Sequence, residues 1–511
     1  MKRLLFMLIV IPMLAGQLYG QEAIDTSIVA QIRDQALNHS QVMDIAFHLT
    51  DASGPRLSNS PGLVRAQEWA KMAMARWGLV NTVLEPWGVF GKGWELKKCY
   101  LALKEPYYKP LIAFPGAWTN GSEGPFTADV VLYHPKDSAE QSVYLGKVKG
   151  KILLYPRYGP IRIPFEPEAT RYTDSELQKM ATPTPIIYRR PSPGVKPVPH
   201  VRVTRPRVPR MLYDAEFNQQ EGILGVLSSG PDNNDGTVFV ASGGRHEWDQ
   251  PLSPMSLALS YEDFHLIQRL LEDSIPVKLE GEVVCNEVAM DSLGYNVVGE
   301  IPGTDPVLKD QLVMLGGHLD SWQGATGATD NGAGASVMLE VVRILEALHI
   351  HPRRTIRIVL WSGEEEGLLG SMGYVKKHFG DRETKIWTKD QGKVSAYYNL
   401  DNGTGRIRGI YLQHDTAAAP IFLQWLTPFE DLGAKTVTIE NTGGTDHQSF
   451  DFVGIPGFQF IQDPIEYEAR THHSNMDSYD HLLPDDLRQA AAIVAFFVYQ
   501  TAMREEMIPR K

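Results

Sequence analysis

The sequence predicts an α/β protein in which a mainly parallel sheet is sandwiched by helices, with a second, smaller domain inserted. From about Asn296 onward, short apolar runs alternate with segments of helical spacing, as in parallel sheets covered on both faces. Between about Gly116 and Lys278, short β-like runs are broken by glycine and proline instead, which indicates a separate mixed α/β or β-rich unit. We therefore expect a main domain built from residues 21–115 and 291–511, and an insert at 116–290.

The bulk composition is that of a folded protein of two or three domains. The chain has 511 residues, of which 43% are hydrophobic and 22% are charged. Its formal net charge of -12 argues against nucleic acid as a partner, because such binding rests on clustered cations. The same charge disfavours an anionic membrane surface.

Residues 1–20 have the features of a secretory signal peptide. Lys2 and Arg3 precede an apolar stretch, Leu4 to Gly16, that is too short to span a bilayer, and small residues offer a cleavage point near Gly20. We expect a cleaved signal and a secreted or periplasmic protein with no stable membrane anchor. The alternative is that this segment is retained as an anchor.

Two further features leave alternatives open. Cys99 and Cys285 are the only cysteines, too few for a disulfide scaffold, and they could either pair or remain as two buried thiols. The stretch from Pro183 to Arg210 is rich in proline and arginine and contains no acidic residue. An extended, solvated loop is the expected reading, and binding of an acidic partner is the alternative.

Apolar spacing locates the elements in chain order. In the first half we expect helices at Ile24–Leu49, Val64–Trp77 and Tyr261–Glu272, and strands at Trp94–Leu103, Ala128–Tyr133, Gly150–Pro156 and Gly222–Ser229. In the second half we expect strands at Leu312–Leu315, Ile356–Trp361, Val394–Leu400, Gly409–Leu412 and Gly457–Ile461. Helices are expected at Gly334–Leu348, Leu368–His378, Ala417–Leu426 and Leu487–Glu505.

Metal-ligating residue types follow three of these strands. His318 comes after LVMLGG, Glu364 and Glu365 come after IRIVLWSG, and Asp401 comes after VSAYYNL. The ligand crevice of a parallel sheet lies beyond the carboxyl ends of its strands, so these side chains are expected to converge there. Two more candidates, Asp330 in GATDNGAG and His473 in THHSNMD, lie in loops.

Each candidate alone has an ordinary explanation. A single histidine such as His318 is usually a hydrogen-bonded core residue, Asp330 could cap a helix, and an acidic run favours a helix start. Together, however, two histidines and three or four carboxylates exceed the needs of one zinc ion. They suit two metal ions that share a bridging carboxylate.

The motifs GGHLDSW, ATDNGAG, GEEEGLLGS, NLDNG and HSNMD resemble, in this order, those of the co-catalytic zinc exopeptidase family. That family includes bacterial leucyl aminopeptidases and the plasma glutamate carboxypeptidase (carboxypeptidase Q) branch, which is the nearer likeness. The resemblance implies a zinc exopeptidase-like fold, two Zn2+ per chain and a protease-associated-like insert.

The resemblance also implies roles for individual residues. It makes Asp330 the bridging carboxylate and Glu364 the general base. His318 and Asp401 would complete one metal site, and Glu365 and His473 would complete the other. His473 is preferred to His472 because it stands four residues before Asp477, as the ligand histidine of the family does.

Two further residues are candidates for catalytic roles. Asp320 is placed to orient the imidazole of His318 as a supporting partner. His447, in GGTDHQSF, is a candidate donor to the oxyanion, and an ordinary structural histidine is the alternative.

The predicted function is a secreted zinc-dependent exopeptidase, either an aminopeptidase or a dipeptidase. It would hydrolyse peptide or dipeptide substrates by means of a metal-bridged hydroxide, and related enzymes are often homodimers. Three alternatives remain: a single-zinc acyltransferase resembling glutaminyl cyclase, a non-catalytic receptor-like ectodomain, and a protein whose middle domain makes it mainly a binding protein.

Overall fold

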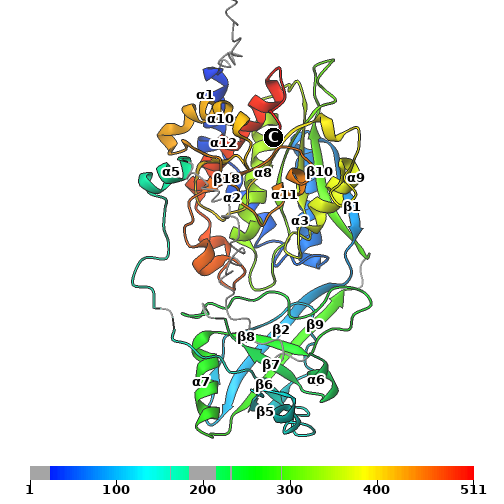
Figure 1. The fold of residues 1–511 in the computed structure, drawn as a ribbon, viewed down its shortest axis with the longest axis vertical. Helices are drawn as coiled ribbons and strands as arrows, with labels where there is room; N and C mark the ends of the chain where they lie inside the picture. Colours follow the sequence, from blue (N-terminus) through cyan, green and yellow to red (C-terminus); the bar gives the residue numbers. More distant parts are fainter. Residues whose placement is uncertain (1–23, 162, 183–214, 231–232, 289–290) are drawn as a thin grey trace, which may run out of the picture.

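The computed structural model describes residues 24–161, 163–182, 215–230, 233–288 and 291–511. The predicted signal peptide and the basic stretch 183–210 therefore lie outside the described residues. The described chain forms two bodies, each built around one eight-stranded sheet (Figure 1). No described helix is both long enough and apolar enough to cross a bilayer.

The larger body contains a mixed sheet with the strand order β1-β10-β12-β11-β15-β18-β16-β17. The strands are β1 (Val80–Val89), β10 (Leu293–Ile301), β11 (Leu312–His318), β12 (Thr355–Trp361), β15 (Val394–Asn399), β16 (Ile407–Tyr411), β17 (Thr436–Thr438) and β18 (Gly457–Gln462). The four central strands β12, β11, β15 and β18 run parallel, so their carboxyl ends meet at one edge. Antiparallel pairs join β1 and β10 on one side and β16 on the other.

Helices cover both faces of this sheet, as Figure 1 shows. Side chains alternate along a strand, so Val313 and Leu315 of β11 join one apolar core whereas Met314 joins the opposite one. The first core contains residues of α1 (Thr26–Asn38), α2 (Val42–Leu49), α3 (Pro61–Trp77), α8 (Ala333–Ala347), α10 (Ala419–Leu426) and α12 (Pro484–Met503). The second contains residues of α9 (Leu369–His378) and α11 (His447–Asp451), and a small hairpin, β13 (Gly380–Asp381) and β14 (Ile386–Trp387), follows α9. The α/β architecture with helices on both sheet faces is confirmed.

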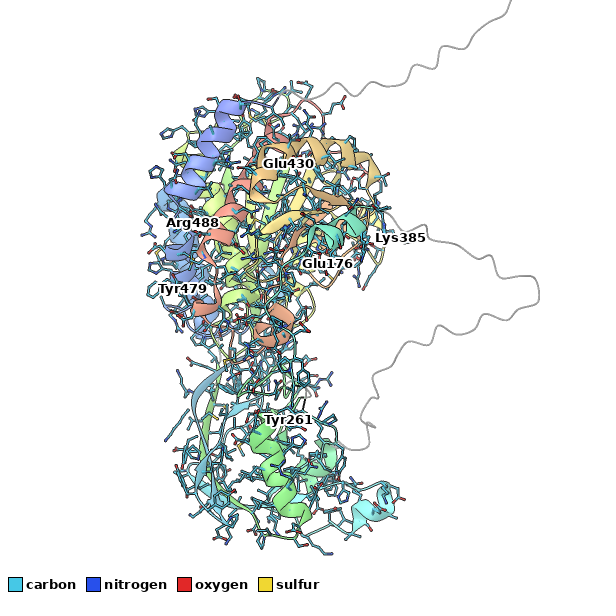
Figure 2. The ribbon with its side chains drawn as sticks, turned by 90° about the vertical axis from the view of Figure 1, so that its left-hand side faces the viewer. Glu176, Tyr261, Lys385, Glu430, Tyr479 and Arg488 are labelled. Atoms are coloured by element: carbon cyan, nitrogen blue, oxygen red, sulfur yellow. The ribbon has the colours of Figure 1, made fainter. Side chains whose placement is uncertain are left out.

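The smaller body, residues 93–288, is called the insert below. Its sheet has the order β3-β2-β9-β5-β6-β7-β8-β4. The strands are β2 (Gly93–Glu105), β3 (Lys109–Pro110), β4 (Ala113–Pro115), β5 (Phe126–Leu132), β6 (Ile152–Leu154), β7 (Gly225–Ser228), β8 (Met255–Leu259) and β9 (Lys278–Val288). Its helices are α4 (Ser138–Ser142), α5 (Asp174–Ala181), α6 (Ala215–Gln220) and α7 (Tyr261–Glu272). Figure 2 shows α7, which begins at the labelled Tyr261, packed in this body, while the labelled Glu176 of α5 lies against the larger one.

The insert starts earlier in the chain than the sequence suggested. A border at residue 116 would fall inside its sheet, because β2 pairs with β9 along nearly its whole length. The two cysteines lie on these paired strands as free, half-buried thiols. Burial raises the pKa of Cys99 to about 11 and that of Cys285 to about 12.

Candidate metal centre

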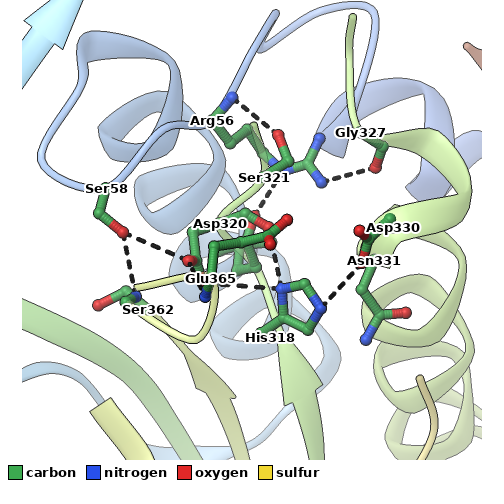
Figure 3. A network of polar contacts seen from close by, with 12 residues as sticks. Arg56, Ser58, His318, Asp320, Ser321, Gly327, Asp330, Asn331, Ser362 and Glu365 are labelled. Atoms are coloured by element: carbon green, nitrogen blue, oxygen red, sulfur yellow. Dashed lines mark hydrogen bonds and ion pairs between the residues drawn. The ribbon is translucent and has the colours of Figure 1, made fainter. Parts of the chain in front are cut away.

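The carboxyl ends of three parallel strands bring the first candidate residues together. His318 is the last residue of β11, Glu364 and Glu365 follow the end of β12, and Asp401 follows the end of β15. Because β12 and β15 flank β11 in parallel register, these residues meet above the central strand. Figure 3 shows His318 and Glu365 in this position, close to Asp330.

Asp330 lies between two imidazoles. Its Oδ1 is 3.2 Å from Nε2 of His318, and its Oδ2 is 3.1 Å from Nε2 of His473. The carboxylate of Asp477 fixes the Asp330 backbone, since it accepts hydrogen bonds from the N–H groups of Thr329 (2.5 Å) and Asp330 (3.1 Å). One carboxylate thus presents a different oxygen to each histidine.

Each histidine has a second carboxylate beside it. Nε2 of His318 is 3.3 Å from Oδ1 of Asp401, and Nε2 of His473 is 2.9 Å from Oε2 of Glu365. All five residues predicted as ligands are therefore joined in one chain of close contacts. His472, which the sequence reading set aside, also lies nearby, with its Nε2 3.7 Å from Oδ2 of Asp330.

The donor set fits divalent cations. The potential ligand atoms of His318, Asp330 and Glu365 all lie within 4.8 Å of one another, as do those of Asp330, His472 and His473. Among the described residues, Oδ2 of Asp330 and Oε1 of Glu365 are buried without a hydrogen-bond donor of good geometry. Buried carboxylate oxygens in this state are costly unless a cation meets them.

The pKa values of Glu364 and Glu365 are raised, whereas, against the effect of burial, His318 and His473 hold the pKa of Asp330 well below its usual range. Burial, reinforced by the charge of Asp330, raises the pKa of Glu365 to about 7. Burial also raises the pKa of Glu364 well above its usual range, with contributions from Asp401 and Asp446, although His318 opposes the shift. A pair of cations would offset this concentration of negative charge.

The imidazole of His318 is held by main-chain and side-chain atoms of Asp320. Nδ1 lies 3.0 Å from the Asp320 carbonyl oxygen and 3.7 Å from its carboxylate. The carboxylate itself accepts hydrogen bonds from the backbone N–H of Glu365 (3.2 Å) and from the hydroxyl of Ser58 (3.3 Å). Asp320 therefore ties the His318 strand end to the Glu365 loop, and its closest contact to the ring is its main-chain carbonyl.

His447 is buried at the start of α11, where its Nε2 lies 3.0 Å from the carbonyl oxygen of Thr442. Burial lowers its pKa to about 4. The adjacent Asp446 is the residue whose charge interacts with Glu364, His318 and Asp401. Successive residues of a helical turn point about 100° apart, so the two side chains cannot share one direction. The charge of Asp401 also acts on His447, and a donor role for His447 stays a prediction.

Two polar residues next to the centre went unnoticed in the sequence. Arg56 is fully buried and donates to the carbonyls of Leu319 (2.5 Å) and Gly327 (2.8 Å), at either end of the loop that leads to Asp330. Ser58 donates to Glu366 (2.7 Å) and accepts from the N–H of Gly363 (3.1 Å). Both residues come shortly after a Gly-Pro break and belong to no motif, so nothing in the local sequence indicated their role.

Comparison with known proteins agrees with this geometry. Residues 296–498, which contain the whole cluster, match the model described as peptidase family M28. Carboxypeptidase Q of Mus musculus is 23% identical over 99% of this chain and 100% of its own length. The crystal structure of a peptidase M28 precursor from Shewanella amazonensis SB2B superimposes with a TM-score of 0.66 at 25% identity, covering 95% of this chain and 98% of that one. A zinc aminopeptidase from Bacillus subtilis has the same fold, with a TM-score of 0.55 at 18% identity over 91% and 95% of the two chains.

The fold and the cluster together define a metallopeptidase. The segment that carries the cluster, residues 296–498, belongs to peptidase family M28.

Proposed function

We propose that this protein is a secreted exopeptidase, an aminopeptidase or a dipeptidase, that works with two zinc ions. The observation that carries the proposal is the placement of Asp330, whose two oxygens lie 3.2 and 3.1 Å from the Nε2 atoms of His318 and His473. A carboxylate shared in this manner is what a two-metal site requires. His318 and Asp401 would hold one ion, and Glu365 and His473 the other.

When bound, the zinc ions would acidify a water molecule and polarise the scissile carbonyl. Glu364 would accept the proton of that water and deliver it to the leaving amine. Glu364 is only 9% exposed and directly precedes the proposed ligand Glu365, which places it beside the metal centre. Asp320 would hold His318 in place, because it bonds to both the His318 ring and the Glu365 backbone.

Trp322 stands next to the proposed metal ligands. A pocket lined by Trp322, Ala325 and Ser474 reaches Asp330, Glu365 and His473. The ring of Trp322 stands edge-on to that of His473, with 6.1 Å between their centroids. The cavity itself is about the size of one water molecule, so Trp322 bounds the metal ligands on this side. The relatives include both a carboxypeptidase and an aminopeptidase, so either chain end is a candidate for cleavage.

The proposal is tested by digesting a mixed library of dipeptides and longer peptides and identifying the products by mass. Release of single residues from one chain end, abolished by a chelator and restored by zinc, is the expected result. Internal cleavage products would contradict an exopeptidase. Elemental analysis should give about two zinc ions per chain, whereas one ion would favour the single-zinc acyltransferase. Secretion is tested separately by sequencing the N-terminus of the exported protein, which should begin near residue 21.

A further inference from the structure

The loop that carries His473 is held from two sides. On the side of the larger body, Asp477 bonds to the backbone around Asp330, and the hydroxyls of Thr471 and Thr329 lie 2.8 Å apart. On the other side the loop contacts the insert. His473 itself has a positive φ of 63°, a left-handed conformation that is uncommon for a residue with a side chain. Such a conformation persists only where the surroundings enforce it.

A short segment of the insert, residues 236–240, pairs with this loop in the manner of an antiparallel strand. The N–H of Val240 donates to the carbonyl of His473 (2.9 Å), and the N–H of Asn475 donates to the carbonyl of Val238 (3.1 Å). Phe239 and Ser474 form the bridge between these two bonds. The residue with the left-handed backbone is therefore bonded directly to the insert.

The side chain of Asn475 completes the pairing. Its Oδ1 accepts from the N–H of Val238 at 2.7 Å, and its Nδ2 donates to the carbonyl of Gly236 at 3.2 Å. Val238 is fully buried, so its N–H would have no alternative partner in water. The amide of Asn475 thus bonds to two main-chain groups of the insert.

A second part of the insert anchors the other end of the loop. Thr170 bridges to Ile465, and Arg171 donates to Asp463 (2.9 Å) and Asp486 (2.6 Å) of the larger body. Glu168 lies 2.9 Å from Arg470, which immediately precedes Thr471 and the two histidines. The insert therefore contacts the ligand loop both before and after His473.

We infer that the insert positions a metal ligand: through Asn475 and residues 236–240 it holds His473 in the geometry that binds one of the two ions. This inference rests on the proposed function, since it assumes that His473 is a ligand. Asn475 is a positioning residue, because it acts through the backbone of the loop and not on the substrate. Removing its amide frees the loop to leave the left-handed conformation, and His473 then spends less time facing Asp330 and Glu365.

The experiment is a zinc titration of the full metal-depleted chain in competition with a chromophoric chelator. In Asn475→Ala, one of the two ions should bind about 10- to 100-fold more weakly, the usual effect of losing a residue that orients a ligand. The other ion should keep its affinity. A matched control is Asn218→Ala. This change also removes a buried amide, but one that bonds to Tyr155 within the insert instead of to the loop of His473. Both ions should bind to this control as to the natural chain.

Unchanged binding of both ions to folded Asn475→Ala would overturn the inference. If circular dichroism shows that this variant does not fold, Glu168→Gln decides instead. That change removes one of the two carboxylates paired with Arg470, the other being Glu466 at 3.7 Å. It should weaken the same ion about threefold, and no change in either ion would overturn the inference. His473→Ala tests the proposed function independently, because it must lose one ion; if it binds two ions as the natural chain does, His473 is not a ligand.

Discussion

Glu364→Gln replaces a carboxylate by an amide of the same shape and removes only the ability to exchange a proton. Glu364 follows the end of β12, directly before the proposed ligand Glu365, and a positioned general base contributes about 10²- to 10⁴-fold to a rate. We therefore expect kcat to fall by about 10³- to 10⁴-fold, the upper part of the range for general bases, which corresponds to about 4 to 5 kcal/mol of barrier. Zinc content should remain that of the natural chain, because the proposed ligands are other residues.

The assay is hydrolysis of a fluorogenic aminoacyl amide or a dipeptide under saturating substrate, with zinc measured in the same sample. Glu346→Gln is the matched control, since Glu346 lies half-buried at the far end of α8 and its burial also raises its pKa. The control should keep full activity. If Glu364→Gln retains zinc and more than about a tenth of the natural kcat, proton transfer by this residue is not part of the mechanism.

Three other perturbations probe the centre and its support. Asp330→Ala removes the carboxylate between the two histidines and should abolish binding of at least one zinc ion, as elemental analysis will show. Arg56→Met leaves several buried carbonyls without a donor and should lower the free energy of unfolding by about 3 kcal/mol, measured by urea denaturation. Near-natural stability of this variant would show that the Arg56 hydrogen bonds do not support the loop. Glu85→Gln tests pH dependence. Although burial opposes the shift, histidine and lysine partners lower the Glu85 pKa to about 2. Glu85 therefore contributes about 1 kcal/mol to the free energy of unfolding above pH ~4.5, and this contribution is lost as the pH falls toward 2. The variant and the natural chain should therefore differ in stability at pH 6 and converge near pH 2.

The elements of both bodies were predictable where local pattern determines them. The apolar runs before His318, Glu364 and Asp401 are the strands β11, β12 and β15, and the observed helix α7 has the predicted bounds Tyr261–Glu272. In a parallel sheet, strand direction alone places these ends at one edge. The convergence of the three segments therefore followed from their sequence without any knowledge of the strand order.

Long-range pairing was not predictable in the same way. The run Trp94–Leu103 was correctly expected to be a strand, but β2 pairs with β9, which is far away in the chain. Nothing in the local alternation distinguishes a strand of the main sheet from one of the insert. The predicted border at residue 116 fell inside the second sheet for this reason.

Polar supports of the site were hidden by the same limitation. Arg56 and Ser58 act through hydrogen bonds to loops that are adjacent only in three dimensions. Of the neighbours Asp446 and His447, only the histidine was considered from the sequence. The direction of each side chain is set by the turn at the start of α11, which the sequence did not resolve.

The two proposed ion sites differ in how firmly their ligands are placed. His318 and Asp401 stand at the ends of buried strands whose neighbours are hydrogen-bonded along their length. His473 lies in a loop, in a left-handed conformation, and depends on contacts from Asp477 and from the insert. Ligands on regular elements are held more accurately than ligands on loops. The ion on the His318 side should therefore be the tighter of the two, and an insert that loosens or tightens its hold on the loop would change the affinity of the other ion first.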